Sequence, residues 1–243
     1  MYPFLFGTVE AYQFLVQAGS VAGIIAFVYI LFKETKDYKQ VFCNLLVQMV
    51  IILVGKKAAE ILRTLNTQGF IGVTALLRES EGSHFLGRVL FVAWTIPWVY
   101  ALINKVLDKR FHLEYKKSMD AVAFYFVIQH IFNRIAYFCN GCCYGKRYFG
   151  IGSIAYQDVG SVYPSQLIEL TFMCITFALL CMLKKKNKPI YGVMLVLFGI
   201  SIFISEFFMD QAGILLFAGM NVIQYASLMC IVTGIIYQKK KGE

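Results

Sequence analysis

One charged residue constrains this chain more than any other feature of the sequence. Arg134 lies inside an apolar stretch, residues 118–140, about two helical turns before that stretch ends. His130 precedes it by four residues, so both side chains lie on one face of a helix. A guanidinium stays protonated at any relevant pH, and a charge within a membrane span is costly. We therefore expect Arg134 to have a partner and a function.

The composition surrounding Arg134 excludes an ordinary soluble domain. Of 243 residues, 59% are hydrophobic and only 15% are charged, whereas soluble domains carry about 25% charged residues. Long apolar runs predict an all-α polytopic membrane protein, with residues 1–243 forming a single integral membrane domain. In such a protein the net charge of +9 is mostly a signal of topology. It suits an anionic lipid surface and does not indicate nucleic acid.

Seven segments are each close to the ~20 residues that cross a bilayer. The second is expected to leave the membrane near Gly55, because Lys56 and Lys57 follow directly. Two long connections, residues 56–85 and 140–162, are expected to form partly ordered flaps. No Lys or Arg precedes the first apolar run, so we expect the first helix to be retained rather than cleaved as a signal peptide. The seven predicted spans are residues 11–32, 41–62, 86–107, 118–140, 163–183, 190–209 and 215–238.

The basic residues predict how these spans are oriented. Lys and Arg concentrate in alternate connections, which favours an N-terminus outside and a C-terminus in the cytoplasm. That orientation brings the polar intramembrane residues to the outer side, where we expect a polar cavity open to the outer leaflet. These residues are Arg88, His130, Arg134, Gln166, Glu169 and Glu206.

The chemistry of these groups leaves two interpretations for each. The planar fork of Arg134 is suited to the phosphate of a phospholipid headgroup, or it forms a structural ion pair with Glu169 or Glu206. His130 either takes a proton from a nucleophile or packs between helices. Glu169 is favoured as a partner that positions Arg134, while Glu206 is left open between a base and a positioning carboxylate.

A cluster of cysteines, residues 139–143, resembles a metal or redox motif at first sight. A zinc site needs about four ligands, and the chain has only three histidines, of which His112 falls on the opposite side of the membrane. We therefore predict no metal here. Small residues instead favour a tight turn, in which Gly141 and Gly145 are expected to supply unusual backbone angles.

At these residues the sequence resembles the prolipoprotein diacylglyceryl transferases. Arg134, Asn140 and Gly145 are in register with the family signature, and the run Gly-Cys-Cys-Tyr-Gly over residues 141–145 is similar to a divergent branch. The run Tyr-Pro-Ser-Gln-Leu-Ile-Glu over residues 163–169 resembles the family's His-Pro-Ser-Gln-Leu-Tyr-Glu. Seven spans with an outside N-terminus are also the layout of that family.

Several positions depart from the family pattern. An arginine of the family's sixth span corresponds to Ile202, and a second one, after Phe-Phe, corresponds to Met209. The third-span His or Tyr corresponds to Leu86. The signature Asn and Glu correspond to Tyr137 and Cys142. Groups presumed to be catalytic in the family are therefore replaced in this chain.

The resemblance implies a transferase of the bacterial plasma membrane. It would move a diacylglyceryl group from phosphatidylglycerol to the lipobox cysteine of a preprolipoprotein, without metal or soluble cofactor. Arg134 would then bind the phosphate, and His130 or Glu169 would assist deprotonation of the thiol. One alternative is a divergent or non-catalytic lipid-binding relative that acts on another acceptor. A small transporter is disfavoured, because the polar residues cluster toward one face of the membrane, whereas secondary transporters bind their substrates near the midplane. The expected substrate-binding residues are Arg88, Asn140, Gly145, Gln166 and Glu206.

Overall fold

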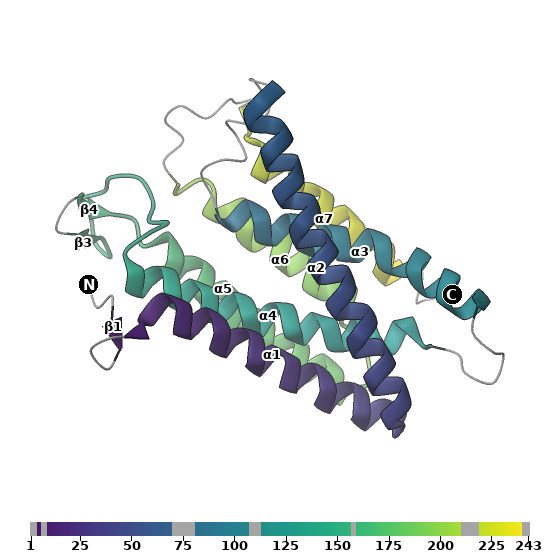
Figure 1. Ribbon diagram of the computed structural model, residues 1–243. Coiled ribbons are helices and arrows are strands. Elements are labelled where there is room, and N and C mark those ends of the chain that lie inside the picture. The colour runs from purple at the N-terminus through teal and green to yellow at the C-terminus, as the bar shows by residue number, and fades with distance from the viewer. Residues whose placement is uncertain are drawn as a thin grey trace. The chain divides into compact units, whose positions relative to one another are not determined.

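A computed structural model of the chain describes residues 4–5, 9–69, 81–106, 113–156, 159–209 and 219–239. Seven helices account for most of these residues, which confirms the predicted all-α membrane fold (Figure 1). They are α1 (Ala11–Thr35), α2 (Tyr38–Gly69), α3 (Glu81–Val106), α4 (Tyr115–Asn140), α5 (Ser165–Lys185), α6 (Tyr191–Ser205) and α7 (Val222–Lys239).

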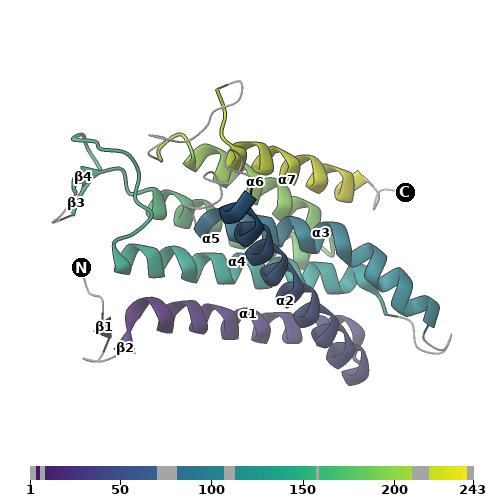
Figure 2. The ribbon, with the colours of Figure 1, turned by 45° about the horizontal axis from the view of Figure 1, so that its top comes forward.

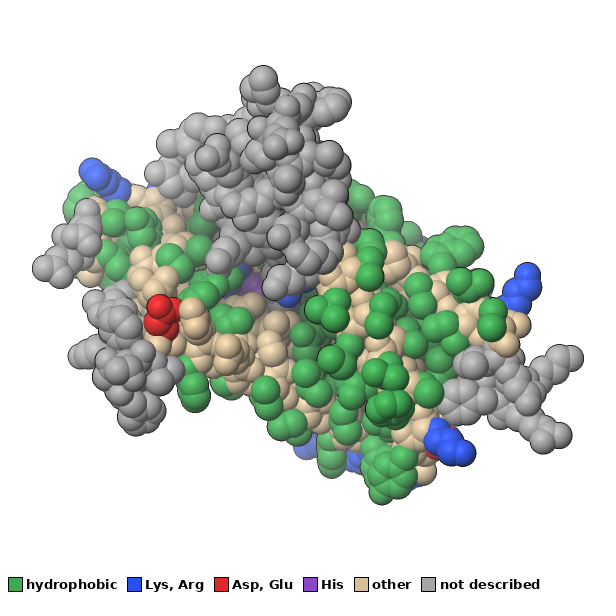
Figure 3. Space-filling view, in the orientation of Figure 1, with side chains coloured by type: hydrophobic (Ala, Val, Ile, Leu, Met, Phe, Trp, Pro, Cys, Tyr) green, Lys and Arg blue, Asp and Glu red, His purple; other side chains and the backbone are tan. Residues whose placement is uncertain are grey.

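Five of the helices are long and apolar enough to cross a membrane, namely α1, α2 over Tyr38–Gly55, α3 over Leu86–Val106, α4 and α5. Helix α6 is a shorter apolar helix of 15 residues. The apolar part of α2 ends at Gly55, as expected from the lysines that follow, although the helix itself continues to Gly69. Hydrophobic side chains are spread widely over the described surface on the face drawn in Figure 3, among backbone and other atoms. Extensive exposed apolar surface suits contact with lipid.

Two short antiparallel hairpins complete the described secondary structure. Strands β1 (Phe4–Leu5) and β2 (Val9–Glu10) precede α1. Strands β3 (Ile154–Tyr156) and β4 (Gly160–Val162) lie in the connection between α4 and α5, with Ile154 opposite Val162. Part of the predicted flap at residues 140–162 is therefore a hairpin. In the other predicted flap, residues 56–69 belong to α2 and residues 81–85 to α3, while residues 70–80 lie outside the described residues.

The chain divides into two compact units. One contains residues 1–25 and 123–243, and the other contains residues 26–122. That residues 1–243 act as a single membrane domain stays a prediction.

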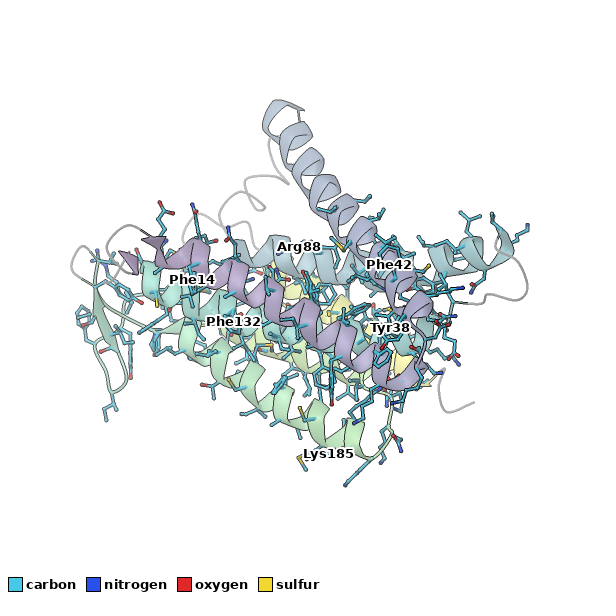
Figure 4. The ribbon with its side chains drawn as sticks, turned by 60° about the horizontal axis from the view of Figure 1, so that its bottom comes forward. Phe14, Tyr38, Phe42, Arg88, Phe132 and Lys185 are labelled. Carbon is cyan, nitrogen blue, oxygen red and sulfur yellow. The ribbon has the colours of Figure 1, made fainter. Side chains whose placement is uncertain are left out.

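The unit of residues 26–122 has a buried polar network at its centre. The hydroxyl of Tyr100 on α3 donates to Asn44 on α2 and contacts the Ser118 hydroxyl of α4, 2.9 Å away. Gln48 adds a bond of 3.1 Å to Ser118. All four side chains are at most 3% exposed. Each buried polar group needs a partner, so these bonds tie the three helices together. Beside the network, α2 exposes Tyr38 and Phe42 (Figure 4).

The other unit contains the tightest helix pair, α6 against α7. A Cβ on Gly192 would lie 2.7 Å from the Gly234 carbonyl oxygen. A Cβ on Gly199 would lie 2.7 Å from the Ser227 carbonyl oxygen. These two contacts place α6 and α7 antiparallel, with their backbones touching. Only glycine allows so close an approach.

Helices α1 and α4 approach each other in the same unit through glycines of α1. A Cβ on Gly19 would lie 2.5 Å from the Cβ of Phe132, which Figure 4 labels on α4. Gln129 of α4 donates to the Ser20 hydroxyl over 3.1 Å. These contacts fix one face of α4. His130 and Arg134 lie on another face, where they contact α5.

Candidate functional site

The site forms around a buried charged cluster of three side chains from two helices. Arg134 Nε of α4 lies 3.0 Å from Glu169 Oε2 of α5, and His130 Nε2 lies 3.1 Å from the same oxygen. The three residues are at most 5% exposed. Their i, i+4 spacing on α4 puts His130 and Arg134 side by side. The structure thus joins the three residues that the sequence named as candidate catalytic groups.

Hydrogen bonds and an ion pair hold this cluster together. Arg134 Nε donates to His130 Nε2 over 3.2 Å. In the His130–Glu169 contact, the roles of donor and acceptor depend on the tautomer of the imidazole. An ionised Glu169 only accepts. Its carboxylate balances the charge of the guanidinium, with which it forms an ion pair.

The two terminal amino groups of the Arg134 guanidinium take no part in this cluster. The cluster engages Nε, and within the described ranges no side chain forms a hydrogen bond with the terminal amino groups. The guanidinium lies over the ring of Tyr137, 5.1 Å from its centroid, and Tyr12 stacks on that ring in turn. Cation–π contact and ion pair hold the side chain in one place. The arrangement offers two positively charged donors to an anion.

A second polar cluster lies at the facing ends of α6 and α7. Glu206 Oε2 accepts from Asn221 Nδ2 over 2.8 Å. The Asn221 side chain accepts from the backbone N–H of Gln224, and the Gln224 side chain accepts from the backbone N–H of Asn221. These two bonds form a capping box at the start of α7. Glu206 also interacts electrostatically with Glu169 and Arg134. The carboxylate of Glu206 is thus held by the cap of a neighbouring helix.

Gln166 ties the cysteine turn to the first turn of α5. Its Nε2 donates to the Cys142 carbonyl over 2.6 Å and to the Tyr156 hydroxyl over 3.4 Å, while Ser165 donates to the Cys143 carbonyl. Burial raises the pKa of the Tyr156 phenol above its ordinary value, so the phenol stays neutral at physiological pH. Gln166 Oε1 is buried and has no hydrogen-bond partner among the described residues.

Two glycines of the turn play different structural roles. Gly141 has a φ of +70°, as expected of a residue that ends a helix. Gly145 does not have a positive φ, so the prediction of unusual backbone angles was wrong there; Cys143, with φ +58°, has the left-handed backbone instead. Gly145 is needed for close packing, because an added Cβ would lie 2.4 Å from the Phe208 carbonyl oxygen.

For the other predicted site residues, the structure shows no hydrogen bond or ion pair to the charged cluster among those it describes. Asn140 is exposed at the end of α4, with its Nδ2 3.6 Å from Cys142 Sγ. Arg88 is half-buried on α3, which belongs to the other unit. Leu86 and Ile202 are both buried. In the described part of the chain, no three His, Cys, Asp or Glu side chains could hold a metal ion.

Two residues of this site were not singled out as site residues by the sequence analysis. Tyr137 was treated only as a substituted family position, yet its ring supports Arg134. Asn221 was not considered, yet it holds Glu206. The Asn-x-x-Gln pattern of residues 221–224 is a capping signature and could have pointed to Asn221. Nothing in the local sequence links that cap to Glu206.

Comparison with known protein families identifies a match. A family model described as prolipoprotein diacylglyceryl transferase matches residues 3–238, which is nearly the whole chain. No curated protein matches the chain.

Proposed function

Because the chain belongs to the prolipoprotein diacylglyceryl transferase family, we propose that it transfers diacylglyceryl from phosphatidylglycerol to the lipobox cysteine of a preprolipoprotein in the bacterial plasma membrane. The cysteine sulfur attacks the glycerol carbon that carries the phosphate. A carbon–sulfur bond forms, the carbon–oxygen bond breaks, and glycerol phosphate leaves with the electron pair. The thiol proton must pass to a base, since the thiolate is the nucleophile.

The observation that carries this proposal is the way Arg134 is held. Glu169 engages the guanidinium at Nε, and Tyr137 lies beneath its plane. The terminal amino groups have the parallel geometry that pairs with two phosphate oxygens. A phosphate bound there would gain negative charge as the carbon–oxygen bond breaks, so Arg134 would stabilise the transition state more than the bound lipid.

The proton acceptor in this proposal is the pair of His130 and Glu169. A neutral imidazole at His130, which lies beside Glu169 and Arg134, can accept a proton at its unprotonated nitrogen. Glu169 then stabilises the imidazolium that forms, as a carboxylate does beside a general base. Gln166 supplies a buried amide oxygen that can accept a headgroup hydroxyl. Asn140, Gly145 and Glu206 complete the proposed substrate-binding residues of this unit, while Arg88, also proposed to bind substrate, belongs to the other unit.

Complementation of a transferase-depleted strain tests this function. The gene is expected to restore labelled lipoprotein, and Arg134→Ala is expected to abolish it. Lys188→Ala removes an exposed basic side chain far along the sequence from the site and is the matched control that should retain function. Membrane insertion of each variant is checked by fractionation.

A divergent relative that binds lipid without this transfer is the second candidate. One observation favours it: Ile202 is buried, 4% exposed, where the resemblance places an arginine of the family. If the wild-type protein inserts in the membrane yet yields no labelled lipoprotein, the transferase proposal fails and this second candidate takes its place.

A further inference from the structure

The connection of residues 141–164 joins the ends of two helices that could each cross a bilayer. It follows α4, which ends at Asn140, and precedes α5, which begins at Ser165; both helices are long and apolar enough to span a bilayer. Figures 1 and 2 show the β3–β4 hairpin standing beyond the adjoining ends of these two helices. The side chains that point outward from this connection therefore meet water, headgroups or another molecule.

Four of these side chains form what we call the loop tip: Lys146, Arg147, Phe149 and Ile151. Phe149 is 83% exposed and Ile151 is 102% exposed, the highest values for large hydrophobic residues in the described part of the chain. Lys146 and Arg147 are exposed as well. Hydrophobic and basic side chains gather over this hairpin end in Figure 3. Since the tip lies outside the helices, contact of the spans with lipid tails does not account for its apolar exposure.

Backbone hydrogen bonds and ring stacking hold the base of the loop tip. Lys146 N donates to the Phe208 carbonyl over 2.8 Å, and Tyr148 N donates to the Ser161 carbonyl over 3.0 Å. The ring of Tyr148 stacks on that of Tyr163, with centroids 4.0 Å apart. Gly152, with φ +84°, turns the chain back towards β3. The outward position of Phe149 and Ile151 is thus built into the loop.

From these contacts we propose that the loop tip anchors this end of the protein in the headgroup layer of the bilayer that it spans. Aromatic and aliphatic side chains beside basic ones are the combination that enters a membrane interface, where the apolar part lies about 5–10 Å into the boundary between headgroups and acyl chains. The two cations select an anionic lipid surface. The anchor requires no transferase activity, so it holds whether or not the proposed reaction does.

Tryptophan fluorescence in proteoliposomes tests the anchor. Trp94 and Trp98 are replaced by Phe, and Phe149→Trp then supplies a single probe in the full-length chain. In vesicles of phosphatidylcholine and phosphatidylglycerol, lipids brominated near the headgroup end of the acyl chain should quench this probe strongly. Aqueous acrylamide should quench it weakly. Ile151→Trp in the same background is the second probe, in case the first variant does not fold.

Two outcomes would overturn the anchor. Strong acrylamide quenching of both probes, without quenching by brominated lipid, would place the tip in water. Protection from acrylamide that appears only when a lipobox signal peptide is added would assign the tip to the client protein instead.

A separate experiment tests whether the loop tip selects a negatively charged lipid surface. Replacing phosphatidylglycerol by phosphatidylcholine alone should reduce the lipid quenching, and the double variant Lys146→Ala/Arg147→Ala should make it independent of lipid charge. The matched control, Lys185→Ala/Lys186→Ala, changes two exposed lysines where α5 ends and should preserve the dependence. Equal quenching in both vesicles by the unchanged tip would refute selection of an anionic surface.

Discussion

A single carboxylate oxygen organises the charged residues of this chain. Glu169 Oε2 forms an ion pair with Arg134 Nε at 3.0 Å and lies 3.1 Å from His130 Nε2. Removing one partner of a buried ion pair leaves an unpaired charge and costs about 3–5 kcal/mol. An alanine at any of the three positions therefore lowers stability as well as activity, so binding and folding must be separated by a gentler substitution.

Arg134→Lys makes that separation. An ammonium can still pair with Glu169, so the thermal midpoint of the detergent-solubilised protein should stay close to that of the wild type. It lacks the second donor of the fork, and a hydrogen bond to a charged group contributes about 1.5–3 kcal/mol. Transfer to a lipobox peptide in proteoliposomes should fall by roughly 10- to 100-fold. Wild-type transfer by Arg134→Lys would show that the fork does not bind phosphate.

Helices α6 and α7 pack through particular glycines. The Cβ of an alanine at position 192 would lie 2.7 Å from the Gly234 carbonyl, and one at 234 would lie 2.6 Å from the Gly192 carbonyl. We expect Gly192→Ala and Gly234→Ala each to lower the free energy of unfolding by about 1–3 kcal/mol. The double variant should lose less than the sum, because both substitutions open the same contact.

Unfolding in mixed detergent micelles measures these changes. Gly87→Ala is the matched control, because nothing lies within 4 Å of a Cβ at that helical position. It should be neutral or stabilising by up to about 1 kcal/mol, since alanine favours a helix over glycine. Equal effects of Gly87→Ala and Gly192→Ala would mean that helix propensity, not close packing, decides stability.

The elements also mark how far the sequence could predict the structure. Apolar runs of nearly constant length predict helices well, and all seven are present. The predicted sixth span ended at residue 209, whereas α6 ends at Ser205, because residues 206–208 form a turn that leads towards Lys146. The glycine contacts of α6 and α7 depend on which helices pair, which hydropathy does not encode. The β3–β4 hairpin was not predicted either, because strands of three residues are too short to show a sequence pattern.

At the scale of the molecule, two buried polar clusters belong to different units. The Tyr100 network joins α2, α3 and α4 in one unit, and the Arg134 cluster joins α4 and α5 in the other. The sequence pointed to the second because an arginine within a span is rare. It did not point to the first, since Asn44, Gln48 and Ser118 are uncharged and are not unusual within a span. A polar cluster is visible in a sequence chiefly when one member carries charge.

The orientation of the whole chain is the last property that the basic residues predict. The last turn of α5 and the residues after it carry Lys184, Lys185, Lys186 and Lys188, and this segment should face the cytoplasm together with the end of α7. The connection of residues 141–164 should then face outward, on the side where exported preprolipoproteins emerge. A fluorescent protein fused after Lys239 should mature, because it folds in the cytoplasm. An alkaline phosphatase inserted at Gly152 should be active only after export.

Neutralising these four lysines provides the control for this orientation. Their replacement by glutamine weakens the cytoplasmic bias, so a fraction of the molecules should insert the opposite way and phosphatase activity at Gly152 should fall. An inactive phosphatase in the unchanged chain, with fluorescence lost at the C-terminus, would reverse the orientation. The charged cluster at the outer ends of α4 and α5 would then face the wrong leaflet for an exported acceptor, and the transfer proposal would fail with it.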